Sequence, residues 1–306
     1  MEKRKIYGNT IKERLLASKR DKMHQFLLAD GQIRGVIVHG TKLVNEMRTN
    51  HELGILETMM LGYGYLGTLL LSSSLKGEER VVLELSCDGA LKGMSVEANT
   101  FGEVRGSLKV KNIPVHAPLE TYDLSPFIGT GILSVTKFLH DRKQPFSGKV
   151  EFTSGSFAYN LAMYSLESEQ IPSSYSLSVC FDSEASVTGA GGLLVQAMPG
   201  ADPGVITGME SIVNELPPIG KEFSESVSAE GFVLQNFAMF DPQFIAERRI
   251  VFYCHCSRER FYRFLSCLDR HELSDIAENG PFPVVLTCHN CNTNYKFAQN
   301  EITLLL

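Results

Sequence analysis

Two close pairs of cysteines near the C-terminus constrain the fold of this chain more than any other feature. One pair lies in "CHC", residues 254–256, and the other lies in "CHNC", residues 288–291. Thiolate sulfur is a soft ligand that suits zinc, and tetrahedral structural zinc sites take two ligands from each of two such pairs. The spacing therefore predicts one zinc ion bound by Cys254, Cys256, Cys288 and Cys291.

A histidine lies inside each pair, and either one could replace a sulfur in a site of three cysteines and one histidine. These residues are His255 and His289. Because four sulfurs already complete a tetrahedron, we expect both imidazoles to lie outside the metal site.

The chain between the two pairs is longer than the usual zinc-ribbon spacing, so it must form structure of its own. Ser257 is placed to cap a helix with Phe261, Phe264, Leu265 and Leu268 on one side. Asp269 with Glu272 has the capping-box pattern of a second helix. The run "FPVVLTC" predicts a strand that leads into the second pair. A unit of this size is too small to be stable without its metal.

The other three cysteines are expected to be structural. Cys87 and Cys180 lie at the ends of alternating strand patterns, which predicts thiols packed in the core. Cys267 is expected on the face of a helix, between the two cysteine pairs.

The balance of charges bears on possible partners and on location. With 29 Lys and Arg against 35 Asp and Glu, the net charge is -6, which argues against whole-chain attraction to nucleic acid or anionic membrane. Residues 1–20 lack the apolar core of a secretory signal, so we expect a solvated helical lead-in of an intracellular protein. The uncharged residues 58–75 are interpreted as a buried core helix.

Alternating strand patterns and a few helical ones define the fold class. Strands separated by glycine-containing turns fill residues 79–106, and helical spacing occupies about 51–75 and 157–170. This mixture predicts an α+β fold and not a doubly wound parallel sheet. We expect three parts. They are a large N-terminal domain of sheets packed around a buried helix (1–198), a helical linker (199–250) and a small zinc-binding domain (251–306).

The expected linker contains an apolar helical stripe that ends at two prolines. The stripe comprises Val205, Ile206, Met209, Ile212, Val213 and Leu216. An apolar stripe in a linker must rest on another surface. It either docks on the larger domain for stability or forms a latent binding surface.

Several stretches across nearly the whole chain carry a resemblance to a known family. They include "LLSSSLKGEERVVLEL", "GALKGMSVEAN", "GILSVTKFL", "LESEQIPSSYSLSV", "GGLLVQAMPGA", "CHCSRERF" and "TCHNCNTNYKF". The chain closely resembles the 33-kilodalton heat-shock protein family, which consists of bacterial redox-regulated holdase chaperones. An N-terminal extension of about twenty residues and the additional Cys267 depart from the family pattern.

The resemblance implies a redox switch. In the reduced, inactive state the four paired cysteines hold one Zn²⁺ per chain. Oxidation links Cys254 with Cys256 and Cys288 with Cys291, releases the zinc and unfolds the C-terminal domain and linker. The family further implies a cytoplasmic chaperone that is not an enzyme, that dimerises on activation and that binds unfolded client proteins without ATP. We infer that such unfolding exposes the apolar stripe to clients.

Two functions of other classes remain as alternatives. Cys288 and Cys291 could serve a thiol oxidoreductase, although the pair follows a strand outside any thioredoxin-like βαβ pattern. A zinc-dependent nucleic-acid-binding protein could use a local group of arginines. This group comprises Arg248, Arg249, Arg258, Arg260, Arg263 and Arg270. We expect these arginines to form a solvated helical face.

Overall fold

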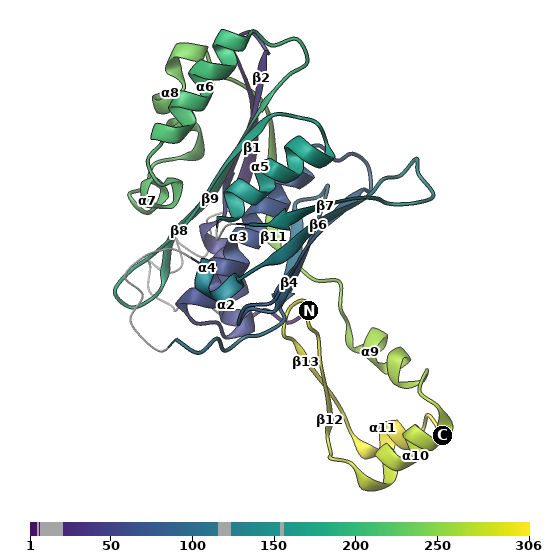
Figure 1. The fold of residues 1–306 in the computed structure, drawn as a ribbon. Helices are drawn as coiled ribbons and strands as arrows, with labels where there is room; N and C mark the ends of the chain where they lie inside the picture. Colours follow the sequence, from purple (N-terminus) through teal and green to yellow (C-terminus); the bar gives the residue numbers. More distant parts are fainter. Residues whose placement is uncertain (5, 7–20, 116–123, 154–155) are drawn as a thin grey trace.

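Two large sheets around a buried helix form the body of the protein, and a smaller helical unit with a two-stranded sheet extends away from it (Figure 1). The structure, a computed structural model, describes residues 1–4, 6, 21–115, 124–153 and 156–306. Most of the predicted lead-in, residues 5 and 7–20, lies outside this description. The architecture confirms the α+β class.

The first sheet, here sheet A, is antiparallel and has the strand order β10-β1-β2-β9-β8. Its strands are β1 (Lys22–Leu28), β2 (Ile33–His39), β8 (Ser173–Phe181), β9 (Val187–Ala197) and β10 (Gln243–Arg249). The β1–β2 hairpin turns through Ala29 and Asp30, both with positive φ, and Gly31 at φ 84°. Glycine adopts this left-handed conformation without a steric cost, so the tight turn can close here.

The second sheet, here sheet B, has the order β11-β5-β4-β3-β6-β7. Its strands are β3 (Arg80–Cys87), β4 (Gly93–Asn99), β5 (Glu103–Leu108), β6 (Gly131–Phe138), β7 (Phe146–Phe152) and β11 (Val251–Phe252). The strands predicted within residues 79–106 are therefore present as β3, β4 and β5. The short β11 joins the edge of the sheet in parallel with β5.

Helix α3 (Ile55–Ser72) contacts strands of both large sheets and forms the centre of the core. It is long and apolar enough to cross a membrane by length and composition, but 89% of it is buried inside the protein. This burial confirms the predicted core helix. Glycines allow the close packing, since a Cβ on Gly64 or Gly67 would lie 2.7 Å from Met94 or Leu161.

Three further helices of the described residues belong to the body. They are α2 (Thr41–His51), α4 (Ser125–Ile128) and α5 (Phe157–Ser168). Helix α5, predicted at 157–170, packs against β7 and β8 and so bridges the two sheets. Helix α2 packs beside α3 and β11 and brings its C-terminal residues close to the second cysteine pair.

A second apolar cluster lies between sheet A and the helices that follow β9. These helices are α6 (Pro203–Glu215), α7 (Ile219–Ser224), α8 (Ala229–Asn236) and the short 3₁₀ helix η1 (Ala238–Phe240). The sheet contributes Phe26, Leu28, Ile33, Ile37, Leu193 and Val195, and the helices contribute Met209, Ile219, Phe223, Ala229, Phe232, Val233 and Phe237. Figure 1 shows α6 and α8 together on the outside of this sheet.

The expected helical linker differs from the structure in one segment. Residues 243–249 form strand β10, which pairs with β1 at the edge of sheet A. Most of the strand is exposed, so it lacks the alternation of apolar residues that marks a half-buried strand. The division at residues 198 and 250 itself stays a prediction.

The C-terminal unit consists of α9 (Arg258–Leu265), α10 (Arg270–Asn279), the β12–β13 hairpin (Val284–Thr287 and Asn294–Phe297) and α11 (Gln299–Thr303). Both predicted caps are present. The Ser257 hydroxyl accepts a hydrogen bond from the backbone N–H of Arg260, and Asp269 with Glu272 forms a capping box. Helix α9 is shorter than expected, so Cys267 lies in the exposed turn after it.

Candidate metal centre

The four paired cysteines meet in one buried cluster, although the two pairs come from distant parts of the C-terminal segment. Cys254 and Cys256 follow β11, and Cys288 and Cys291 lie in the turn between β12 and β13. The Sγ atoms of Cys254 and Cys288 are 3.8 Å apart, and those of Cys256 and Cys291 are 3.3 Å apart. All four sulfurs lie within 4.8 Å of one another. The four cysteines are therefore positioned to bind a metal ion.

The hairpin turn presents its two sulfurs from one side because the backbone folds back on Cys288. The carbonyl of Cys288 accepts hydrogen bonds from the N–H groups of Cys291, at 3.3 Å, and Asn292, at 2.7 Å. Asn292 adopts a left-handed conformation with φ 57°, which asparagine tolerates better than most residues. The N–H of Cys288 in turn donates to the carbonyl of Thr293 at 2.9 Å.

The other thiols of the cluster lower the pKa of Cys254. Hydrogen bonds from the thiols of Cys288 and Cys291, opposed by burial, hold the pKa of Cys254 far below that of an ordinary thiol. The contact with Cys254 raises the pKa of Cys288 to about 11, and contacts with Cys254 and Cys288 raise the pKa of Cys291 well above its usual value. Such a cluster attracts a cation, which would allow all four sulfurs to be thiolates.

Hydroxyl groups contact the sulfurs of Cys256 and Cys291. The Tyr295 hydroxyl donates a hydrogen bond to Sγ of Cys256 at 3.1 Å. Sγ of Cys291 and Oγ1 of Thr293 are 3.2 Å apart. Both supporting residues lie shortly after Cys291 in the chain, in the turn and on β13. Partners of this kind orient ligands and tune a metal site.

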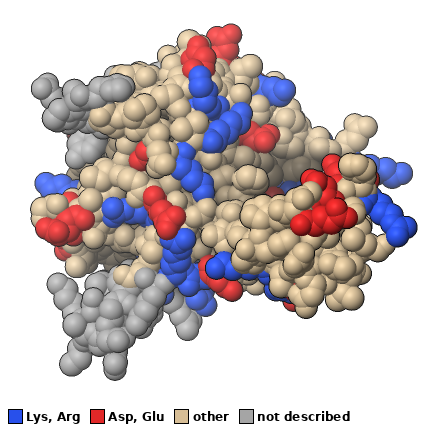
Figure 2. Space-filling view, turned by 90° about the horizontal axis from the view of Figure 1, so that it is seen from below, with Lys and Arg blue, Asp and Glu red and all other residues tan. Residues whose placement is uncertain are grey.

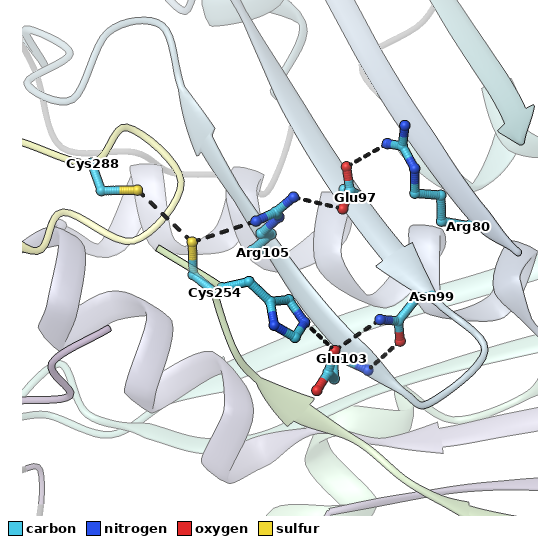
Figure 3. A network of polar contacts seen from close by, with 8 residues as sticks. Arg80, Glu97, Asn99, Glu103, Arg105, Cys254 and Cys288 are labelled. Carbon is cyan, nitrogen blue, oxygen red and sulfur yellow. Dashed lines mark hydrogen bonds and ion pairs between the residues drawn. The ribbon is translucent and has the colours of Figure 1, made fainter. Parts of the chain in front are cut away.

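Sheet B contacts Cys254, the first cysteine of the first pair (Figure 3). The guanidinium of Arg105 on β5 is 3.7 Å from Sγ of Cys254 and 2.8 Å from Glu97 on β4. The backbone just before Cys254 continues along β5, since the N–H of Tyr253 donates to the carbonyl of Val104 at 3.1 Å. The first pair therefore begins directly after the edge strand of sheet B.

Helix α2 and the first residues of the chain hold the centre from the other side. Asn50, which is 2% exposed, donates hydrogen bonds to the carbonyls of Cys291 and Glu2, both at 3.0 Å. The N–H of Cys254 donates to Sδ of Met1 at 3.1 Å. The amino group of Met1 donates to the carbonyl of Cys256 at 2.8 Å.

Both neighbouring histidines lie outside the group of four possible ligands. The side chain of His255 is 57% exposed, and its Nε2 lies 2.7 Å from a carboxylate oxygen of Glu103. His289 is exposed at the tip of the turn. Cys87 and Cys180 are half-buried on β3 and β8, and burial raises the pKa of each thiol.

Arg105, Asn50, Thr293, Tyr295 and Met1 are residues of this site that sequence reasoning did not identify. Arg105 and Asn50 precede Cys254 and Cys291 by 149 and 241 residues, so no local spacing links them to the cysteines. Thr293 and Tyr295 lie close to Cys291 in the sequence. Their position directly after the second cysteine pair could have indicated that they belong to the site.

Two of the arginines considered for nucleic-acid binding have partners within the C-terminal unit. Arg258 pairs with Glu301 at 2.6 Å and covers the ring of Phe297, and Arg260 lies over the ring of Phe264. On the face drawn in Figure 2, Lys and Arg alternate with Asp and Glu, and they form no continuous basic surface among the residues described. The arginines of α9 and α10 are exposed on helices, as expected. The expected helical face is wrong for Arg248 and Arg249, because both lie on strand β10.

Comparisons with known proteins agree on one class. The family model described as "Hsp33 protein" matches residues 21–298. The "33 kDa chaperonin" of Desulforamulus reducens is 32% identical over 288 residues, which cover 94% of this chain and 97% of that protein. The "33 kDa chaperonin" of Bacillus subtilis is 32% identical over 287 residues, covering 92% and 97%.

A solved structure agrees with these relatives. The crystal structure of the 33 kDa chaperonin of Thermotoga maritima, a heat shock protein 33 homologue, superposes with a TM-score of 0.83. The two chains are 30% identical, and the match covers 94% of this chain and 98% of that one. The protein is thus a molecular chaperone and not an enzyme. The chain belongs to the Hsp33 protein family.

Proposed function

We propose that this protein is a redox-regulated, ATP-independent holdase that binds unfolding proteins under oxidative stress. Membership of a chaperone family supports the binding of unfolded clients. The buried four-sulfur cluster supports the regulation and is the observation that carries the proposal.

The proposed resident metal is one Zn²⁺ per chain, held by Cys254, Cys256, Cys288 and Cys291 in the reduced state. Zinc–sulfur bonds of about 2.3 Å place tetrahedral sulfurs about 3.8 Å apart. The separation of 3.8 Å between the sulfurs of Cys254 and Cys288 fits this value, and the sulfurs of Cys256 and Cys291, 3.3 Å apart, lie closer together than in a zinc-bound tetrahedron. Bound zinc stabilises a small domain by about 10 to 16 kcal/mol, so the C-terminal unit should unfold when the metal leaves.

Oxidation removes the ligands. In the proposed switch Cys254 pairs with Cys256, and Cys288 pairs with Cys291. Each disulfide forms as two thiols lose two electrons and two protons, which reduce one molecule of peroxide to two molecules of water. A disulfide sulfur is no longer a thiolate, so the zinc site is lost.

The proposed client surface is the apolar stripe of α6 together with the face of sheet A beneath it. Met209 is 3% exposed, and Val205, Ile206, Ile212, Val213 and Leu216 pack half-buried against the same cluster. If the helices leave the sheet, both halves of this cluster become available to apolar segments of a client. Exposed apolar surfaces of this kind mark interaction sites.

We further propose that the protein acts in the cytoplasm and forms a homodimer when activated. Nucleic acid and membrane are not among its proposed partners. The interspersed charges on the visible face agree with this view.

Light scattering of a heat-denatured client tests the proposed function. The protein is compared in its reduced, zinc-loaded form and after warm treatment with peroxide or hypochlorite. We expect suppression of scattering only after oxidation. Suppression in both states would indicate a constitutive holdase with a merely structural metal, and suppression in neither would refute the proposal. Turnover of an insulin-type disulfide and retention on polynucleotide test the two alternatives.

A further inference from the structure

Arg105 connects the cysteine cluster to sheet B through both of its amino groups. Nη1 lies 3.7 Å from Sγ of Cys254, and Nη2 lies 2.8 Å from a carboxylate oxygen of Glu97 (Figure 3). The side chain is 20% exposed, so water screens these contacts only in part. A charge-assisted contact in such a place is stronger than one on the open surface.

The sheet fixes the direction of this guanidinium. Glu97 lies directly opposite Arg105 in the register of β4 and β5. The second carboxylate oxygen of Glu97 accepts a hydrogen bond from Arg80 on β3 at 2.8 Å, and the Arg80 guanidinium in turn covers the ring of Phe138 at 3.7 Å. Glu97 is held between two arginines, so Arg105 can reach Cys254 without losing its partner on the sheet.

A second set of contacts holds the residue next to Cys254. Nε2 of His255 lies 2.7 Å from Glu103, and Glu103 also accepts a hydrogen bond from Asn99 at 2.8 Å. Cys254 is therefore fixed on the sheet through its own sulfur, as Figure 3 shows, and through the side chain of His255.

The charge of Arg105 distinguishes Cys254 from the other three ligands. The hydroxyls of Tyr295 and Thr293, which contact the sulfurs of Cys256 and Cys291, are neutral. Four thiolates around one divalent cation carry a net negative charge, which a neighbouring guanidinium stabilises. A hydrogen bond donated to a thiolate also draws electron density from the sulfur and makes it a weaker nucleophile.

We propose that Arg105 is a positioning residue of the metal centre, which holds the Cys254 thiolate on sheet B and slows both release of the metal and oxidation of this cysteine. The inference rests on the proposed metal centre but not on chaperone activity. Through Arg105, the N-terminal domain would control how readily the metal is released and Cys254 is oxidised.

Zinc release from reduced protein tests this role without any client. A chromogenic chelator in excess reports the rate for wild type, Arg105→Gln and Arg105→Lys. Loss of an outer partner typically weakens metal binding about 10- to 100-fold, so we expect Arg105→Gln to release zinc at least about tenfold faster. Arg105→Lys keeps the charge but not the fork of donors, and we expect an intermediate rate.

Arg80→Gln is the matched control. It removes an arginine from the same carboxylate but leaves the contact with Cys254 in place. We expect its zinc release to remain close to that of wild type. In the same samples, site-resolved alkylation should be faster at Cys254 in Arg105→Gln, with far-UV circular dichroism unchanged before release.

Two outcomes would overturn the inference. Equal rates in wild type and Arg105→Gln would show that the contact does not act on the metal centre. Equally faster zinc release in Arg80→Gln and Arg105→Gln would show that any disturbance of sheet B has this effect. A wild-type protein that purifies reduced and without zinc would instead refute the proposed metal centre itself.

Discussion

The buried side chain of Asp21 caps the N-terminus of a helix elsewhere in the sequence. Helix α2 begins after Gly40, which has no side chain to cap it. Oδ2 of Asp21 instead accepts a hydrogen bond from the N–H of Leu43 at 2.6 Å. Burial raises the pKa of Asp21 to about 7, although hydrogen bonds from the backbone of Leu43 and Lys42 oppose this shift. Asp21 is only 6% exposed.

The sign of this shift makes the folded state less stable at higher pH. At low pH both the folded and the unfolded chain carry the proton. Between pH 3.8 and about pH 7 only the unfolded chain gives it up, so stability falls as pH rises. Above about pH 7 the ionised carboxylate destabilises the folded state by the full amount. This amount is on the order of 4 kcal/mol at most, since one pKa unit corresponds to about 1.4 kcal/mol.

We therefore predict that Asp21→Asn reduces the dependence of stability on pH. The amide still offers an oxygen to the N–H of Leu43 but does not ionise. Urea unfolding of the reduced protein at pH 5 and pH 8 measures the effect. Wild type should lose more free energy of unfolding than the variant, by a few kcal/mol. An equal loss in both proteins would contradict the assigned ionisation.

At the scale of elements, the two cysteine pairs differ in how easily a disulfide can form. Cys288 and Cys291 share a tight turn, in which the N–H of Cys291 donates to the carbonyl of Cys288. Cys254 lies just after β11, and its surroundings tie it to β5, to Arg105 and to Met1. A disulfide needs Cα atoms about 4.4 to 6.8 Å apart, which a turn offers readily and an extended Cys-x-Cys barely reaches.

We predict that Cys288 and Cys291 pair first under mild peroxide at low temperature. Alkylation of the remaining thiols followed by mass spectrometry identifies the first bridge. Cys267→Ser serves as a background, because the exposed Cys267 could otherwise exchange with the pairs. A bridge between Cys254 and Cys256 that appears first would contradict the prediction.

The contact between α7 and β9 offers a way to loosen the covering helices without touching the cysteines. A Cβ on Gly189 of β9 would lie 1.8 Å from the carbonyl oxygen of Gly220 in α7. Gly189→Ala should push α7 away from sheet A, with a cost of about 1 to 3 kcal/mol. Hydrogen exchange of α7 and α8 should rise, and the reduced variant should suppress client scattering in part.

Gly208→Ala in α6 is the control for this change. There the added methyl group makes an ordinary contact with Phe240 at 3.5 Å. Alanine also favours the helix, so this variant should behave like wild type. Unchanged exchange of α7 in Gly189→Ala would show that the close approach does not hold the helix in place.

For the whole molecule, sequence patterns predict those elements whose structure depends on residues close together in the sequence. Alternation defines β3, β4 and β5, and spacing defines the cysteine cluster and α6. The hairpin of β1 and β2 was not predicted, although Asp30-Gly31 is a turn signal. Arg105 and Asn50 could not be predicted, because only the packing of sheet B and α2 brings them to the cysteines.

The path of the chain around sheet A bears on how a bound client could leave. The segment that carries α6, α7 and α8 begins after β9 and ends at β10, and both strands belong to this one sheet. The pairing of β10 with β1 does not involve the cysteine cluster, so we expect β10 to stay in sheet A when the metal centre unfolds.

The displaced helices would therefore remain attached at both ends, as a tethered competitor for the apolar face that they covered. A short tether gives an effective concentration on the order of millimolar, well above that of most free proteins. When the thiols are reduced and the metal returns, the helices can displace the client intramolecularly. The connectivity of the chain would then drive client release without hydrolysis of a nucleotide.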